Sequence, residues 1–293
     1  MYRTEWIRSH YLIGLSVVLI GAALLMAAEH ADWGAGDPKM WGALVGGSMA
    51  AAATALGTLP VVLSVRFSDR AYDSMLGFGA GVMLAASSFS LILPALAAAK
   101  GQGAGSWGAG GIVGTGILMG AFCLLLIDRL MPHEHFVKGR EGAHGKKLKR
   151  VWLFVLAISL HNLPEGLAIG VAFAGPDAVG ANALAVGISI QDIPEGMVVA
   201  LALHGVGYTR GVSVAMAVLS GLVEPLAAVF GVAVISLSSI FLPWGLAAAA
   251  GAMLFVISHE IIPESHRQGH EAYATVGLML GFVLMMLLDT ALG

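Results

Sequence analysis

Two short motifs in this chain carry the residues whose types and spacing could do chemistry. HNLPEG begins at His161 and QDIPEG begins at Gln191, and each lies inside a long apolar stretch. Because His161 and Glu165 are four residues apart, they share one side of a helix. Gln191 and Glu195 repeat that relation. Imidazole, carboxylate and amide groups spaced in this way are ligands for divalent metals such as Zn, Mn, Fe or Cd.

Further polar residues at a similar depth enlarge this set. Asn162 and Asp192 each follow the first residue of a motif, and Glu224 lies midway along the next apolar stretch. An acid at the bilayer centre costs about 2.5–3.5 kcal/mol, so each one needs a partner. Four acids match the charge of two divalent cations, which predicts a binuclear metal centre with protons replacing absent metal. These acids are Glu165, Asp192, Glu195 and Glu224.

Prolines accompany each group of candidate ligands. Pro164, Pro194 and Pro225 lack a backbone N–H, so each is predicted to kink or open its helix. A lone polar residue in a membrane helix often only bonds to a neighbour. A repeated pattern with matched prolines instead favours a binding site, because transporters place such sites on interrupted helices of internal repeats.

The elements that must position these residues are membrane helices. The chain has 293 residues, 58% of them hydrophobic and only 11% charged, whereas a soluble domain has about 25% charged residues. A helix needs about 20 apolar residues to span a bilayer. The candidate spans are 11–28, 42–65, 74–98, 108–130, 151–174, 179–203, 210–238, 243–262 and 273–292. We expect 11–28 to be a retained span rather than a signal peptide, because no clear cleavage site follows it.

The positive charges of the loops predict the orientation. Alternating loops place 13 of the 15 Lys and Arg residues on one side, and only Lys39 and Lys100 on the other. By the positive-inside rule the basic side is cytoplasmic, which puts the basic loop 131–150 in the cytoplasm and the C-terminus outside.

Several other classes of function lack support in the sequence. Cys123 is the single cysteine, so a Cys-based metal cluster is excluded. The Gly-rich segment 100–111 neither follows a strand nor ends in Lys-Ser/Thr, so it does not indicate a phosphate-binding loop. We expect no organic cofactor and no nucleic-acid partner.

Four segments resemble the signature helices of the ZIP (Zrt-, Irt-like protein) family of divalent metal transporters: HNLPEGLAIG, QDIPEGMVVA, GLVEPLAAVFG and VISHEIIPES. The resemblance covers most of residues 42–293. It implies an all-α polytopic membrane protein with an eight-helix core of inverted repeats, arranged three-two-three. Residues 1–41, with their extra N-terminal transmembrane helix, would lie outside this core.

The resemblance also implies two adjacent metal positions. The first would use His161, Glu165, Gln191 and Glu195, with Met83 covering it. The second would share Glu165, Asp192 and Glu195 and be completed by Asn162 and Glu224. Many relatives have His or Glu shortly before the proline of the second core helix, whereas this chain has Ser90 before Pro94. The metal choice at this entrance position therefore stays open.

The cytoplasmic ends carry a second group of candidate ligands. His259, Glu260 and Glu264 close the span 243–262, and HEIIPE lacks the second histidine that a zinc protease motif requires. We interpret these residues as contacts for exiting metal. The loop histidines His133, His135 and His144 are either part of this relay or simply solvated. Asp128 and Asp289 lie near span ends and are expected to be interfacial.

The leading hypothesis is a carrier that moves Zn²⁺, and also Cd²⁺, Fe²⁺ or Mn²⁺, into the cytoplasm. The resemblance implies an elevator-like motion, a homodimer in the lipid bilayer and a bacterial inner membrane location. One alternative is a metal-selective channel with the same ligands. Another is an intramembrane metalloenzyme, although ligands supplied wholly by the protein leave little open coordination for water activation.

Overall fold

The computed structural model describes residues 37–64, 68–130, 162–205 and 207–292, and all its regular elements are helices. The predicted span 11–28 and the basic loop 131–150 lie outside these residues. So do four candidate ligands: His133, His135, His144 and His161.

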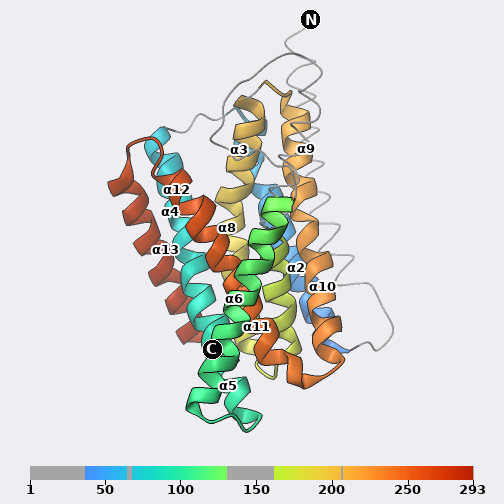
Figure 1. The fold of residues 1–293 in the computed structure, drawn as a ribbon. Helices are drawn as coiled ribbons and strands as arrows, with labels where there is room; N and C mark the ends of the chain where they lie inside the picture. The colour runs from blue at the N-terminus through green and yellow to red at the C-terminus, as the bar shows by residue number, and fades with distance from the viewer. Residues whose placement is uncertain (1–36, 65–67, 131–161, 206, 293) are drawn as a thin grey trace, which may run out of the picture.

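The described chain forms a bundle of long helices, several of which are interrupted (Figure 1). The first half contains α2 (Pro38–Gly57), α3 (Leu59–Val62), α4 (Asp69–Ala85), η1 (Ala86–Ile92), α5 (Leu93–Gly101) and α6 (Ser106–Leu130). A helix over 162–174 follows. The rest contains α8 (Ala178–Gly205), α9 (Arg210–Gly221), α10 (Val223–Ser236), η2 (Ser239–Phe241), α11 (Leu242–Val256), η3 (Ile257–Ile261), α12 (Ile262–Ser265) and α13 (Glu271–Leu292).

Short polar side chains set where several of these helices begin. Asp37, Ser68 and Thr209 cap α2, α4 and α9 by accepting a hydrogen bond from a first-turn N–H. Asp177 does the same for α8, where its Oδ1 lies 2.9 Å from the Gly180 nitrogen. Each cap satisfies a backbone donor that the helix itself leaves free.

Seven stretches of the described chain are long and apolar enough to span a membrane. They correspond to the predicted spans, apart from 11–28 and 151–174. The helix over 162–174 is the described part of the latter. The prediction of an all-α polytopic membrane protein is therefore confirmed.

Interrupted helices recur in matching places of the first and last three spans. The segments η1 and η3 are π-helical, and each is followed by a proline, Pro94 and Pro263 respectively. α2 gives way to α3 just before Pro60, and α9 gives way to α10 just before Pro225. Proline explains these positions, because it removes a donor from the helical ladder. The matching breaks support the expected inverted repeat.

The helices pack as two groups that meet at α8. α4 packs along α13 and α6 along α11, whereas α2 packs against α8, α9 and α10. Figure 1 shows α13 and α4 on one side of the bundle, α9 and α10 on the other, and α8 between them. In the most apolar windows of α2 and α8, 72% of residues are buried, against 22% for α6 and α13. The latter two therefore present most of their apolar surface outward, as lipid-facing helices do.

The α4–α13 pair is held by reciprocal glycine contacts. A Cβ added at Gly77 or Gly81 would lie 2.0 Å from a carbonyl oxygen of α13. A Cβ at Gly277 or Gly281 would lie 2.1 Å from one of α4. Only glycine allows this backbone approach, which is the small-residue packing used by helices in lipid.

Candidate metal site

The candidate ligands lie on three neighbouring elements. The helix over 162–174 carries the first motif and α8 carries the second, while Glu224 lies in the first turn of α10. A Cβ at Gly166 would lie 2.4 Å from the Glu224 carbonyl oxygen, so glycine in the first motif lets α10 approach closely. The predicted break at Pro225 is present, since α9 ends at Gly221. Pro194, by contrast, lies inside a continuous α8, where it removes a hydrogen-bond donor without ending the helix.

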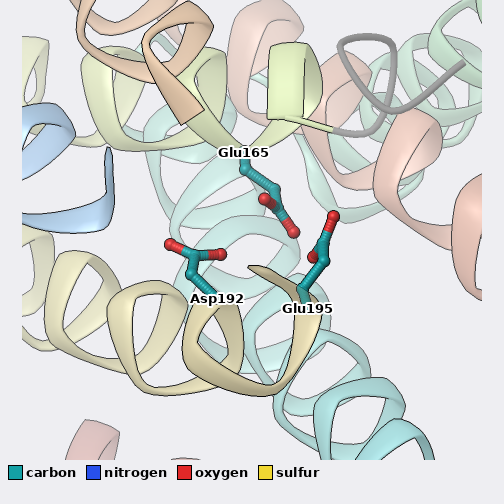
Figure 2. Close-up of side chains that lie close together, drawn as sticks. All are labelled: Glu165, Asp192 and Glu195. Atoms are coloured by element: carbon teal, nitrogen blue, oxygen red, sulfur yellow. The ribbon is translucent and has the colours of Figure 1, made fainter. Parts of the chain in front are cut away.

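Three carboxylates converge between these helices. One oxygen each from Glu165, Asp192 and Glu195 lies within 4.8 Å of the other two. Figure 2 shows Glu165 reaching toward Asp192 and Glu195, which come from successive turns of α8. Glu165 and Asp192 are buried, and Glu195 is half-buried. Carboxylates this close in a dry interior require cations or protons between them.

Neutral side chains donate hydrogen bonds to one oxygen of each buried acid. Gln191 donates from Nε2 to Glu165 Oε1 at 2.5 Å and to Asp192 Oδ1 at 2.6 Å. Asn162 Nδ2 donates to Glu224 Oε1 at 2.9 Å. Glu224 is fully buried, and its place in the first turn of α10 puts its negative charge near the positive end of the helix dipole.

The second oxygen of each of these acids has no hydrogen-bond partner. Four buried acceptor atoms of this site lack a donor: Glu165 Oε2, Asp192 Oδ2, Glu224 Oε2 and Asn162 Oδ1. Buried polar atoms are normally paired, so a group of unpaired acceptors needs a specific explanation. A hard or borderline cation, or a proton, is the complementary partner for such oxygens.

Gln191 and Met83, two further predicted ligands, lie beside the carboxylate cluster. Gln191 turns its amide nitrogen toward the acids, so ligation through Oε1 requires the amide to turn over. Met83 is buried on α4, one turn beyond Gly79, where an added Cβ would lie 3.6 Å from Gln191 Oε1. The α4 helix thus runs past the Gln191 side of the cluster.

Ser90 is buried within η1, where its hydroxyl donates to Asp289 Oδ1 on α13 at 2.7 Å. Asp289, which was expected to be interfacial, thus forms a polar pair with Ser90 between η1 and α13. The π-helical turn displaces Ser90 from its α-helical position, which the sequence pattern does not reveal.

The predicted exit residues do not gather into a second cluster in the part of the chain that the structure describes. His259 is exposed and stacks on Phe255 with ring centroids 4.9 Å apart. Glu264 forms an ion pair with Arg267 at 2.9 Å. Glu260 is half-buried in η3.

Two polar contacts could not be predicted from spacing. Thr54 of α2 donates from Oγ1 to Glu224 Oε1 at 3.2 Å. His270, just before α13, places Nδ1 3.0 Å from Oδ2 of the fully buried Asp73 on α4. Both pairs join residues more than 150 positions apart, where no helical periodicity links them.

A bundle of membrane-spanning helices defines a polytopic membrane protein, and the converging carboxylates give it a candidate cation site in its interior. Comparison with known proteins agrees with this class. The family model described as ZIP zinc transporter matches residues 137–289.

Full-length relatives extend the match. The zinc transporter GufA of Myxococcus xanthus is 50% identical over 87% of this chain and 100% of its own length. The zinc transporter ZIPB of Bordetella bronchiseptica is 49% identical over 98% of this chain and 94% of its own length. The human zinc transporter ZIP11 is 33% identical over 88% of this chain and 99% of its own length.

The chain therefore belongs to the ZIP family of transporters. It is a multi-pass membrane protein that transports metal ions. The metalloenzyme hypothesis is set aside, because these relatives are transporters.

Proposed function

We propose that this protein carries Zn²⁺ into the cytoplasm through a binuclear site at the centre of the membrane. The observation that carries the proposal is the convergence of Glu165, Asp192 and Glu195, next to buried oxygens that have no donor. The relatives named as zinc transporters support Zn²⁺ as cargo. Cd²⁺, Fe²⁺ and Mn²⁺ accept the same nitrogen and oxygen ligands and are proposed as secondary cargo.

The two cation positions are assigned by ligand type. The first uses His161, Glu165, Gln191 and Glu195, beneath Met83. The second shares Glu165, Asp192 and Glu195 and adds Asn162 and Glu224. Two divalent cations neutralise the four acids, and protons take their place when the metal leaves. This exchange is needed because an ionised carboxylate without a partner is too costly in a low-dielectric interior.

Release to the other side requires alternating access rather than an open pore. We propose that α2, the helix over 162–174, α8, α9 and α10 move as one unit against α4, α6, α11 and α13. The division into two packed groups that meet at α8 supports this elevator-type motion.

Entry and exit are assigned to opposite ends of the bundle. Ser90 lies on the entrance path, and its bond to Asp289 places a carboxylate beside it. His259, Glu260 and Glu264 receive metal at the cytoplasmic end, together with the loop histidines. The asymmetry of basic residues supports this orientation, with the basic loop 131–150 inside, and we propose a homodimer in a bacterial inner membrane.

The decisive test is metal uptake by the purified protein in proteoliposomes. Wild type should give saturable Zn²⁺ uptake that is stimulated by metal on the far side. His161→Ala and Glu195→Ala should each abolish it, because each removes a ligand. Glu271→Gln is the matched control, since this exposed carboxylate at the start of α13 lies outside the proposed path.

Two outcomes would contradict the proposal in different ways. Unchanged uptake in both ligand variants would refute the site. Flux that rises linearly with Zn²⁺ concentration would replace the carrier with a metal-selective channel built on the same ligands.

A further inference from the structure

Thr54 places a hydroxyl group in the middle of the apolar helix α2, and the residue is only 2% exposed. Its Oγ1 lies 3.2 Å from Glu224 Oε1 and 3.3 Å from the carbonyl oxygen of Ala50, one turn back. A threonine hydroxyl carries a single proton, so it donates to one of these acceptors at a time. The side chain therefore has two alternative acceptors within reach, one of them a proposed cation ligand.

The backbone around Thr54 is held from two further helices. A Cβ added at Gly196 of α8 would lie 2.1 Å from the Thr54 carbonyl oxygen. A Cβ added at Gly221, at the end of α9, would lie 3.0 Å from the Thr54 Cβ. Two glycines of the signature segments therefore sit against this one residue. The backbone and Cβ of Thr54 cannot shift without moving α8 or the α9–α10 junction, so their position relative to Glu224 is restricted.

The two donors to Glu224 meet on the same oxygen. Thr54 Oγ1 and Asn162 Nδ2 both donate to Oε1, while the buried Oε2 has no hydrogen-bond partner. A carboxylate held through one oxygen presents the other in a single direction. Glu224 Oε2 is thus oriented by its neighbours before any cation arrives, which lowers the cost of ordering the ligand on binding.

We infer that Thr54 is a positioning residue that sets the affinity of the second cation position through Glu224. The inference rests on the proposed binuclear site, to which it adds a residue outside the ligand set. When a cation binds Glu224 Oε2, the Thr54 hydroxyl keeps its bond to Oε1 and the carboxylate stays oriented. The Ala50 carbonyl is the alternative acceptor, so the hydroxyl is not left unpaired if Glu224 moves away.

The test is a calorimetric titration, in which Zn²⁺ is added to the metal-free, full-length protein in detergent. Wild type should bind two equivalents in two steps. Thr54→Val keeps the shape that packs against Gly196 and Gly221 but removes the hydroxyl. It should weaken the second step roughly 10-fold or more, the factor expected for a lost hydrogen bond to a charged group. The first step should change less than about threefold on the same scale.

Two variants make the comparison specific. Thr54→Ser keeps the hydroxyl and should restore the second step. Thr58→Val removes an equally buried hydroxyl from the next turn, where it donates only to the Ala55 carbonyl at 2.7 Å, and should leave both steps unchanged. If Thr54→Val does not fold, Thr54→Ala removes the same hydroxyl without adding a methyl group at that position.

A double-variant comparison separates positioning from packing. In a Glu224→Gln background, adding Thr54→Val should have no further effect on the remaining step. Thr54→Val could instead lower the Zn²⁺ affinity equally in the wild-type and Glu224→Gln backgrounds, or weaken both binding steps equally. Either result would show that Thr54 serves packing and would overturn the inference. Two unchanged steps in Thr54→Val would overturn it as well. A wild type that binds fewer than two equivalents would instead refute the binuclear site, and the role of Thr54 with it.

Discussion

Buried acids occur in two regions of this protein, and the two regions treat them differently. Near the turn between α12 and α13, Glu264 pairs with Arg267 and Asp73 pairs with His270. At the centre of the bundle, an amide from Gln191 or Asn162 and the hydroxyl of Thr54 donate to the acids instead. A guanidinium supplies its own positive charge, whereas an amide orients a carboxylate and leaves its charge unbalanced.

This difference separates a structural use of acidic residues from a binding use. Where the chain supplies a guanidinium or an imidazole as partner, the pair stabilises the fold and has little need of a metal. Where it supplies only neutral donors, the remaining charge is available to a cation that enters and leaves. Substitutions at the central acids should therefore lower the affinity for metal and raise the stability of the metal-free protein. Substitutions near the turn between α12 and α13 should lower stability and leave metal binding unchanged.

The largest expected effect comes from neutralising two central acids. The double variant Glu165→Gln/Asp192→Asn should lose Zn²⁺ affinity roughly 100-fold or more, because breaking a buried charge pair costs about 3 kcal/mol or more. Its metal-free form should melt at a higher temperature than wild type, because the two amides need neither a cation nor a bound proton to be neutral in the buried site. Calorimetry and thermal melting measure the two effects.

Added Zn²⁺ provides the control for this prediction. Metal at 100 times its dissociation constant should stabilise wild type by about 2.7 kcal/mol and leave the double variant almost unchanged. A double variant that melts lower than wild type without metal would contradict the view that these acids serve binding at the expense of stability.

An intermediate effect is expected at the Asp73–His270 pair. His270→Ala removes the partner of a fully buried carboxylate, which should lower stability by about 1–3 kcal/mol. Zn²⁺ binding at the centre should be unaffected. Chemical denaturation followed by circular dichroism gives the stability, and His270→Gln, which can still donate, should recover part of the loss. An unchanged stability in His270→Ala would mean that the pair contributes nothing to the fold.

The smallest effect is expected at Arg267, whose side chain is 43% exposed. Arg267→Ala should cost less than about 1 kcal/mol, because solvent weakens an exposed ion pair. Raising the salt concentration should reduce the difference in stability between wild type and Arg267→Ala, since salt screens the ion pair. A loss of stability in Arg267→Ala as large as that in His270→Ala would contradict the view that the exposed pair contributes less than the buried one.

The central acids could be predicted from the sequence because each motif lies within one helix. The spacing of Asp192 and Glu195 fixes both on one face of α8, and the helix over 162–174 brings Glu165 to the same depth. Which oxygen of each acid is held could not be predicted, because that depends on side-chain rotation. The direction in which Gln191 turns its amide also depends on side-chain rotation and could not be predicted.

Contacts between distant segments lay beyond the reach of periodicity. Thr54 occurs in the run AAAATALG, where one hydroxyl among small residues gives no sign of a carboxylate partner. The break before Pro225 followed the expectation from proline, whereas α8 continues through Pro194. The sequence did not indicate that Pro94 and Pro263 each follow a π-helical turn, since a helix can absorb a proline in several ways.

The glycine contacts between α4 and α13 have a mechanical consequence. Backbone touches backbone at four places along this pair, so no rotamer change can accommodate sliding between the two helices. The contact between α8 and α13 is different, because Gly187 faces the side chain of Met285 rather than a carbonyl. A thioether chain with three rotatable bonds yields readily. We therefore expect α4 and α13 to move together as one rigid pair, with sliding concentrated where Met285 of α13 meets Gly187 of α8.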